Sequence, residues 1–248
     1  MNARYWAVIP AAGVGSRMSA GTAKQYLPLL DKTVIEWSLA PFIEDPRIEA
    51  VVVVIAASDT QWRALPIANH PKLRVTIGGA DRAASVRAGL ALLHQQALAE
   101  ANATGENWVL VHDAARPCLT RSDLSDLIAA VQNEPAGGLL ATPLADTLKQ
   151  ADSEQYVVRT IARRGLWRAL TPQMFRFAIL QRALEQALAA GLEVTDDASA
   201  VEALGLKPRL VVGRADNLKI TVPEDLDSAA RILATRDLSC EQSVTNHE

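Results

Sequence analysis

Two glycines and two basic residues near the N-terminus form a pattern suited to binding a polyphosphate. Gly13 and Gly15 follow the apolar run Tyr5–Ile9, which is of the kind that forms a strand. Glycine lacks a Cβ atom, so backbone N–H groups in such a turn can approach an anion closely. Arg17 and Lys24 add two positive charges within reach of this turn. The segment therefore predicts a phosphate-binding loop that would suit a triphosphate.

The best-known nucleotide-binding motifs do not account for this loop. Met18 stands where G-x-G-x-x-G requires its third glycine, and no G-x-x-x-x-G-K-[ST] occurs in the chain. A plain tight turn is the alternative for a lone G-x-G after a strand. Arg17 and the Lys24–Leu27 stretch favour phosphate binding over that alternative.

An aspartate and an arginine follow a second apolar run, at 107–112. Asp113 stands at the carboxyl end of this predicted strand, where a carboxylate can hold a divalent cation beside triphosphate oxygens. Arg116 could contact phosphate; the alternative is that Asp113 caps a turn and pairs with Arg116. We interpret His112 as a packing or hydrogen-bonding residue rather than a general base.

Other segments could supply the rest of a nucleotide site. Asp216 could complete the metal site, and Lys219 could neutralise phosphate charge, although a solvated surface lysine is the usual alternative. The segment Gly78–Arg82 offers small residues between a strand pattern and a helix pattern, which would leave room for a flat base. Ser85 is near enough to contribute, and a plain strand-to-helix turn is the alternative there.

Hydroxyl and guanidinium groups later in the chain are of the kind that hold a phosphomonoester. They belong to Thr147, Arg163, Thr171 and Thr195. Thr171 stands in a Thr-Pro-Gln stretch that on its own predicts an ordinary loop. Thr195 precedes a predicted helix, so it could be the N-cap, a ligand of a polyol hydroxyl, or both.

Strand patterns and helix patterns alternate along the chain, which indicates an α/β doubly wound sheet with ligand loops at the carboxyl ends of the strands. Apolar runs predict strands at 5–9, 49–56, 74–77, 107–112 and 138–142. Helical spacing of apolar residues predicts helices at 86–97, at 124–131 with Ser122 as cap, at 177–188, and from 223 onward. A polar turn at 152–154 predicts an inserted β-hairpin at about 148–163.

The composition is that of a globular enzyme, and we expect it in the cytoplasm. Hydrophobic residues make up 49% and charged residues 21% of the 248 residues. We expect one domain over 1–236 and a polar, disordered tail at 237–248. A net charge of −3 provides no basic field for nucleic acid or anionic membrane. The distant cysteines Cys118 and Cys240 argue against a disulfide framework or a zinc site, and no apolar run reaches the roughly 18 residues of a membrane span.

Several of these strings, taken together, resemble the 2-C-methyl-D-erythritol 4-phosphate cytidylyltransferase family. They are Pro10–Met18, Lys24–Leu27, Val111–Pro117 and Ala215–Thr221, and the resemblance extends from residue 5 to about 232. It implies a Rossmann-like, mixed but mostly parallel sheet of the nucleotidyltransferase type, and a homodimer formed through the hairpin arm. It also implies CTP and a polyol phosphate as substrates and Mg²⁺ as the cofactor, with no nucleic acid or membrane partner.

The resemblance also assigns roles to individual residues. CTP binding would fall to Pro10, Ala11, Ala12, Gly13, Gly15, Gly79, Ala80, Ser85, Asp113 and Ala114. Catalysis at the phosphates would fall to Arg17, Lys24 and Lys219, and metal binding to Asp113 and Asp216. The polyol phosphate would contact Arg116, Thr147, Arg163, Thr171 and Thr195, with Arg163 supplied by the neighbouring subunit. The family often has an acid where this chain has Ala80, so a contact there would come from the backbone.

Three other functions stay open on the sequence alone. A ribitol 5-phosphate cytidylyltransferase would share the fold and the nucleotide but use a different polyol. A more distant enzyme of this kind would join another nucleotide to a hexose 1-phosphate. A nucleotide-binding regulator without catalysis is the third, and the presence of Arg17, Lys24, Asp113 and Lys219 argues against it.

Overall fold

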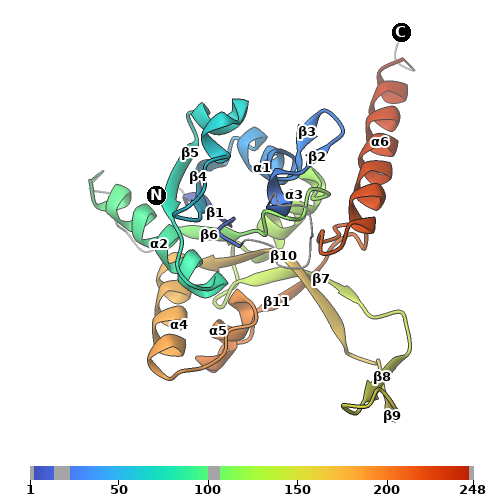
Figure 1. Cartoon of the computed structure of the whole chain (residues 1–248). Coiled ribbons are helices and arrows are strands. Elements are labelled where there is room, and N and C mark those ends of the chain that lie inside the picture. Colours follow the sequence, from blue (N-terminus) through green and yellow to red (C-terminus); the bar gives the residue numbers. More distant parts are fainter. Residues whose placement is uncertain (1–2, 14–22, 100–106, 246–248) are drawn as a thin grey trace.

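The computed structural model describes residues 3–13, 23–99 and 107–245, and its centre is one β-sheet (Figure 1). The sheet consists of β1 (Tyr5–Pro10), β4 (Ile48–Ile55), β5 (Leu73–Ile77), β6 (Trp108–Val111), β7 (Gly138–Pro143), β10 (Trp167–Arg176) and β11 (Arg209–Val212). Their order across the sheet is β11-β7-β10-β6-β1-β4-β5. Strand β10 pairs antiparallel with β6 and β7, and the other pairings are parallel. The predicted mixed, mostly parallel sheet is confirmed.

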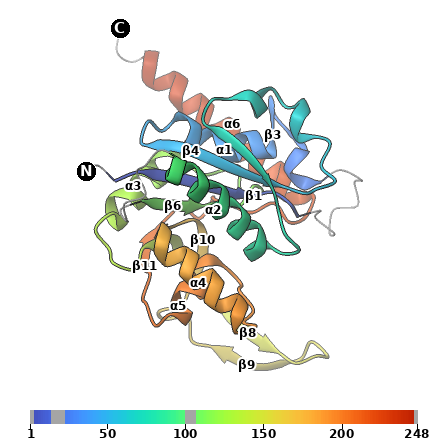
Figure 2. The ribbon, with the colours of Figure 1, turned by 90° about the vertical axis from the view of Figure 1, so that its left-hand side faces the viewer.

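Helices cover both faces of this sheet (Figure 2). On one face lie α1 (Val34–Glu44) and α3 (Arg121–Val131), and on the other lie α2 (Arg82–Ala99), α4 (Phe177–Ala189) and α5 (Asp197–Ala203). Alternate residues of β1 serve the two sides: Ala7 and Ile9 join the first core, whereas Trp6 and Val8 join the second. A strand with both faces buried in this way must be apolar, as β1 is and as β4 is after the exposed Glu49.

A third, smaller core lies beneath the last helix. Helix α6 (Glu224–Thr245) packs near the short strands β2 (Pro28–Leu29) and β3 (Lys32–Thr33), with Leu29, Ala229 and Leu233 buried between them. The expectation of a disordered tail at 237–248 stays a prediction. Among the described residues, no helix is long and apolar enough to cross a membrane.

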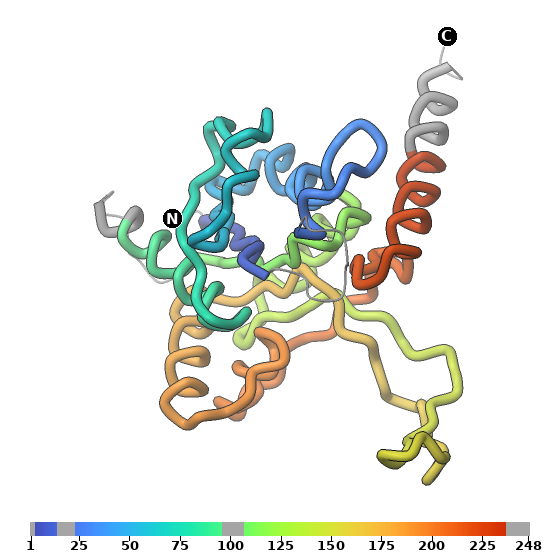
Figure 3. The backbone as a smooth tube through the Cα atoms, in the orientation of Figure 1, coloured from blue at the N-terminus to red at the C-terminus, as the bar shows by residue number. Residues whose placement is uncertain are grey.

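The predicted hairpin projects from the body as a separate arm (Figure 3). It consists of β8 (Leu148–Ala151) and β9 (Val157–Ile161), which pair antiparallel. Its turn is held by the Asp152 carboxylate, which accepts hydrogen bonds from the backbone N–H groups of Glu154 and Tyr156. Three large hydrophobic side chains of the arm are exposed in the single chain, namely Tyr156, Val157 and Val158.

The structure corrects three local expectations. Thr171 lies inside β10 rather than in a loop; the strand tolerates Pro172 because its pairing with β7 shifts register between Ala169 and Gln173. Helix α3 is capped by Thr120, whose hydroxyl accepts from the Asp123 N–H, and not by Ser122. Helix α5 is capped by Asp196, one residue beyond Thr195. In both helices, the N-cap is the residue whose side-chain oxygen accepts a hydrogen bond from the backbone N–H three residues later in the sequence.

Candidate active site

A cavity opens where β1, β5 and β6 end, the edge of the sheet at which doubly wound folds bind ligands. Its volume is about 230 Å³. The predicted site residues that line it are Pro10, Ala11, Ala12, Gly13, Lys24, Gly79, Ala80, Ser85, Asp113, Ala114 and Lys219. Segments far apart in the sequence therefore converge as the motifs implied. Gly15 and Arg17 lie outside the described residues.

The loop that follows β1 is held in place by Gln25, a residue to which the sequence analysis gave no role. The amide Nε2 of Gln25 donates to the carbonyl oxygen of Ala11 at 2.7 Å and to that of Gly13 at 3.4 Å. Gln25 is buried and belongs to the short helix η1 (Lys24–Tyr26), so the same turn that anchors the loop also brings Lys24 to the cavity.

Two glycines at the end of β5 bring the backbone close to neighbouring atoms. A Cβ atom on Gly78 would lie 2.6 Å from the Ala12 Cβ and 2.6 Å from the Ser85 Oγ, and one on Gly79 would lie 2.4 Å from the Ala84 Cβ. The Ser85 hydroxyl donates to the Asp81 carbonyl oxygen at 2.9 Å. Its proton is thus engaged, which leaves the Ser85 oxygen available as an acceptor at the cavity wall.

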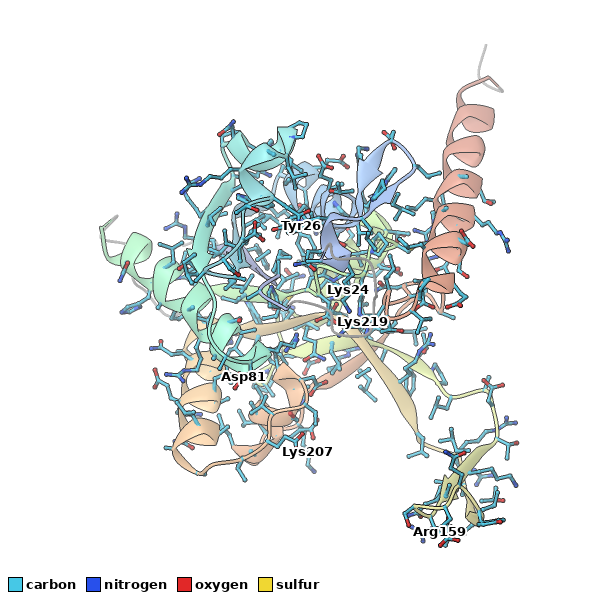
Figure 4. All side chains as sticks on the ribbon, in the orientation of Figure 1. Lys24, Tyr26, Asp81, Arg159, Lys207 and Lys219 are labelled. Atoms are coloured by element: carbon cyan, nitrogen blue, oxygen red, sulfur yellow. The ribbon has the colours of Figure 1, made fainter. Side chains whose placement is uncertain are left out.

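Lys24 and Lys219 reach the cavity from opposite ends of the sequence. Figure 4 shows them beside each other at the centre of the molecule, whereas Arg159 lies far out on the arm. The Lys24 ammonium donates to the Ile220 carbonyl oxygen at 3.0 Å, next in sequence to Lys219. This contact joins the loop after β1 to the segment before α6, so the two lysines are positioned together.

Asp113 is the electrostatic centre of the site. Its Oδ1 lies 3.1 Å from Arg82, and its Oδ2 lies 3.0 Å from Lys219 and 3.3 Å from Arg116. Burial alone would raise the pKa of Asp113, but the charges of Arg82, Lys219 and Arg116 hold it well below its usual range. Asp113 is therefore ionised at neutral pH. In the free protein it neutralises cations that a bound phosphate could use instead.

His112 and Thr171 support Asp113 from beneath. The Asp113 N–H donates to the Thr171 hydroxyl oxygen at 3.2 Å, that hydroxyl donates to His112 Nδ1 at 2.8 Å, and His112 Nε2 donates to the Arg116 carbonyl at 3.1 Å. Burial lowers the pKa of His112 to about 4, so the ring is neutral at pH 7. His112 thus serves as a hydrogen-bonding residue, as the sequence analysis interpreted it, and Thr171 positions Asp113 from a buried place.

The residues assigned to the polyol phosphate are not all brought together within one chain. Arg116 lies against Asp113 and donates to the Asn217 carbonyl oxygen at 2.9 Å. Thr147 and Arg163 are exposed where the chain enters and leaves the arm, and Thr195 is exposed before α5. None of these three residues lines the cavity. Within one chain, the cavity therefore brings together the described residues that were predicted to contact CTP, but not these three.

The structure does not place Asp216 beside Asp113. The carboxylate of Asp216 pairs with Arg214 at 2.7 Å and with Arg236 at 3.0 Å, and Asp216 is not among the residues that line the cavity. Within the described part of the chain, no three acidic, histidine or cysteine residues cluster as a metal site. Asp113 alone fits a cation that arrives with phosphate, because Mg²⁺ is commonly bound by one or two carboxylates together with substrate oxygens and water.

Arg82 also lines the cavity, although the sequence alone predicted no role for its side chain. It is the first residue of α2, and its guanidinium lies 3.1 Å from Asp113 and 2.8 Å from Asp197. A positive side chain in the first turn opposes the helix dipole, so its presence there needs a compensating anion. That conflict was visible in the sequence and could have identified Arg82, but Asp197 lies more than a hundred residues away and only the fold brings it near.

The fold and the cavity together define a class: a doubly wound α/β protein with a cavity at the carboxyl ends of parallel strands, lined by the basic residues Lys24, Arg82 and Lys219. A family model described as 2-C-methyl-D-erythritol 4-phosphate cytidylyltransferase matches residues 5–235. The chain belongs to the 2-C-methyl-D-erythritol 4-phosphate cytidylyltransferase family.

Individual relatives agree with this membership. The chain is 49% identical over 223 residues to the 2-C-methyl-D-erythritol 4-phosphate cytidylyltransferase of Pseudomonas syringae pv. tomato, covering 90% of this chain and 92% of that one. A crystal structure of a 4-diphosphocytidyl-2C-methyl-D-erythritol synthase is similar with a TM-score of 0.80 and 40% identity, covering 94% of this chain and 100% of that one. A crystal structure of the 2-C-methyl-D-erythritol 4-phosphate cytidylyltransferase of Francisella tularensis is similar to this chain with a TM-score of 0.79 and 33% identity. The match covers 92% of this chain and 99% of that one.

Proposed function

We propose that this protein transfers the cytidylyl group of CTP to 2-C-methyl-D-erythritol 4-phosphate, giving 4-diphosphocytidyl-2-C-methyl-D-erythritol and pyrophosphate. Family membership supports the pair of substrates. The observation that carries the proposal is the convergence of Lys24, Lys219 and Asp113 on one cavity beside the glycine-rich loops. These groups meet the needs of phosphoryl-type transfer, which is mainly positioning and charge stabilisation.

In the proposed reaction, an oxygen of the substrate phosphomonoester attacks the α-phosphorus of CTP in line. A new P–O bond forms, the bond to the leaving pyrophosphate breaks, and the electron pair leaves with the pyrophosphate. The attacking phosphate is already ionised at neutral pH, so the reaction needs no general base. The neutral, buried His112 is consistent with that. Lys24 and Lys219 would stabilise the negative charge that develops on the phosphates, with Arg17 as a further predicted partner.

Recognition of cytosine would come from the small residues at the end of β5 and after β1. The exocyclic amino group of cytosine is a donor, and it would find acceptors in the Ser85 hydroxyl oxygen and in backbone carbonyl groups near Ala11 and Gly79. Uracil presents an oxygen at that position and would leave these acceptors unpaired. The role of these residues is a prediction from the family pattern and from their position in the cavity.

Magnesium is the proposed cofactor, and it would supply charge neutralisation between the phosphates. Asp113 would hold it together with phosphate oxygens, because Asp113 is an ionised carboxylate on the cavity wall. Asp216 would take part only if it left both arginine partners. The cytoplasmic location expected from the sequence also remains a prediction.

We further propose that the protein is a homodimer in which the arm of one subunit completes the site of the other. A lone two-stranded hairpin is barely stable in water, and this one exposes Tyr156, Val157 and Val158, so a partner surface would bury them. Arg163 lies at the base of this arm, away from its own cavity. Two-fold dimers are the most common homo-oligomers. In such a dimer, the arm would bring this arginine to the phosphate site of the partner.

Mixed dimers test this arrangement. Lys24→Ala and Arg163→Ala should each be nearly inactive alone, but co-expressed chains should recover about a quarter of wild-type activity, because half of randomly paired dimers hold one intact site. Mixing Lys24→Ala with Lys219→Ala is the control, since both residues line the same cavity and every mixed dimer has two damaged sites. No recovery in verified Lys24/Arg163 heterodimers would contradict a contribution across the interface.

The function itself is tested by measuring pyrophosphate release from CTP with each candidate polyol phosphate. We expect turnover with 2-C-methyl-D-erythritol 4-phosphate and much less with ribitol 5-phosphate. Preference for ribitol 5-phosphate, or for another nucleotide with a hexose 1-phosphate, would replace the proposed substrate pair. Binding of CTP without pyrophosphate release with any of these acceptors would favour the non-catalytic regulator.

A further inference from the structure

Arg82 connects two parts of the molecule that are otherwise separate in sequence. It begins α2 directly after the loop 78–81, and it faces both Asp113, at the end of β6, and Asp197, the first residue of α5. Its side chain is 26% exposed and lines the cavity, whereas the Asp197 side chain is fully buried. A guanidinium is planar and rigid, so it can hold two carboxylates in a fixed geometry as a lysine cannot.

Asp197 is placed where a carboxylate is costly. Burial raises its pKa, and the charge of Arg82 opposes that rise. Neither carboxylate oxygen has a well-oriented hydrogen bond among the described residues, so the 2.8 Å contact with Arg82 is the interaction that offsets part of the cost of its burial. The surrounding helix start is held separately, since Gln173 of β10 accepts from the Ala198 N–H and donates to Asp196. Asp197 is therefore not needed to cap α5.

The two oxygens of Asp113 have different partners. Oδ1 faces Arg82, and Oδ2 faces Arg116 and Lys219, of which Lys219 lines the cavity. Whatever fixes Oδ1 therefore decides where Oδ2 points. A residue that acts directly on a ligand is commonly held in its orientation by a neighbouring side chain, and Arg82 is such a neighbour of Asp113.

We infer that Arg82 is a positioning residue that orients the Asp113 carboxylate for the reaction, and that the buried Asp197 holds Arg82 in place. This inference rests on the proposed function, because Asp113 is taken to act on the CTP phosphates. When the phosphates engage Lys219 and Arg116, the Arg82 contact keeps Asp113 from turning with them. Asp197 contacts no substrate and acts only through Arg82.

The experiment is a set of double-mutant cycles in kcat, with CTP affinity measured by calorimetry. Arg82→Lys keeps the charge but loses the two-sided contact, and Asp197→Asn keeps the shape but loses the charge. Each should lower kcat about 10- to 100-fold while changing the CTP Kd less than about threefold, since misplacement of a reacting group affects the transition state most. The double variant Arg82→Lys/Asp113→Asn should have a kcat less than about twofold below that of Asp113→Asn alone.

The matched control is the pair Arg47 and Asp45, which has the same chemistry with a 2.9 Å contact and does not line the cavity. Arg47→Lys and Asp45→Asn should leave kcat within about twofold, whatever they do to the melting temperature. A folded Asp197→Asn with unchanged kcat would overturn the inference. A double variant Arg82→Lys/Asp113→Asn whose loss of kcat equals the product of the two single losses would overturn it too. If Asp197→Asn does not fold, the Arg82/Asp113 cycle decides. Failure of the proposed function is separate, because wild-type protein would then release no pyrophosphate from CTP.

Discussion

Replacing Asp113 by asparagine should have opposite effects on nucleotide binding and on turnover. In the free protein, Asp113 pairs with Lys219, Arg82 and Arg116 at 3.0, 3.1 and 3.3 Å. An incoming triphosphate without metal must compete with this carboxylate for the same cations. Asparagine has nearly the same shape but no charge, so it removes the competitor and leaves the cations in place.

The size of the effect follows from the pair that phosphate must displace. Lys219 and Arg82 are the partners of Asp113 on the cavity wall, and Lys219 has no second carboxylate partner among the described residues. A hydrogen bond between charged groups, such as that of Lys219, contributes about 1.5–3 kcal/mol. The Lys219 side chain is 39% exposed, so solvent screening favours the lower end of that range. A difference of about 1.4 kcal/mol makes metal-free CTP or pyrophosphate bind Asp113→Asn about tenfold more tightly than wild type.

Turnover should move the other way. A neutral amide is a poorer ligand for Mg²⁺ and cannot hold the cations in register, so kcat should fall about 100-fold or more, with a higher Mg²⁺ requirement. Calorimetry with CTP in EDTA, beside steady-state rates over a range of Mg²⁺, measures both effects. Asp216→Asn is the control, because its carboxylate pairs with Arg214 and Arg236 away from the cavity. Weaker metal-free CTP binding by a folded Asp113→Asn would refute the competition argument.

Two further variants test other parts of the site. Lys24→Ala should lower kcat about 100- to 1,000-fold and change the CTP KM much less, because its charge matters most as the pentacoordinate phosphorus forms; a change of only a few-fold in steady-state kcat would make Lys24 an ordinary surface lysine. His112→Asn tests the pH dependence of stability. The pKa of His112 is lowered from 6.5 to about 4 in the folded state, so the unfolded chain alone takes up this proton between those values. The free energy of unfolding of wild type should therefore fall by about 3 kcal/mol as the pH falls from 6.5 to 4, and chemical denaturation of His112→Asn should lack this part of the slope. Identical slopes would contradict a buried, neutral His112.

Strands buried on both faces were the easiest elements to predict from the sequence. Strands β1 and β6 are apolar throughout, β4 is apolar after Glu49, and their pattern has no competing interpretation of similar strength. Strand β10 was not predicted because it contains a proline and pairs through a register shift. It lies in the middle of the sheet, and a proline there is tolerated only at such an irregularity, which pairing partners decide and local sequence does not.

The candidate site was predictable where its residues follow strands. Asp113, Gly79 and Gly13 each come two or three residues after the end of a strand, so their meeting at one edge follows from the parallel topology. Gln25 and Asp197 could not be found in this way. Each acts through a contact with a residue that is distant in sequence: Gln25 with the Ala11 carbonyl oxygen and Asp197 with Arg82.

The charges around the cavity explain why the arm belongs to the proposed mechanism. Among the described residues that line it, the cations Lys24, Arg82 and Lys219 face the carboxylates Asp81 and Asp113, so the free cavity is close to neutral. A triphosphate and a phosphomonoester together bring several negative charges to this place. Releasing Lys219 and Arg116 from Asp113 provides cations for the first of these polyanions, but those charges cannot serve both substrates at once. The second polyanion needs positive charge from outside this set. In the proposed homodimer, Arg163 of the arm would supply that charge to the partner's site.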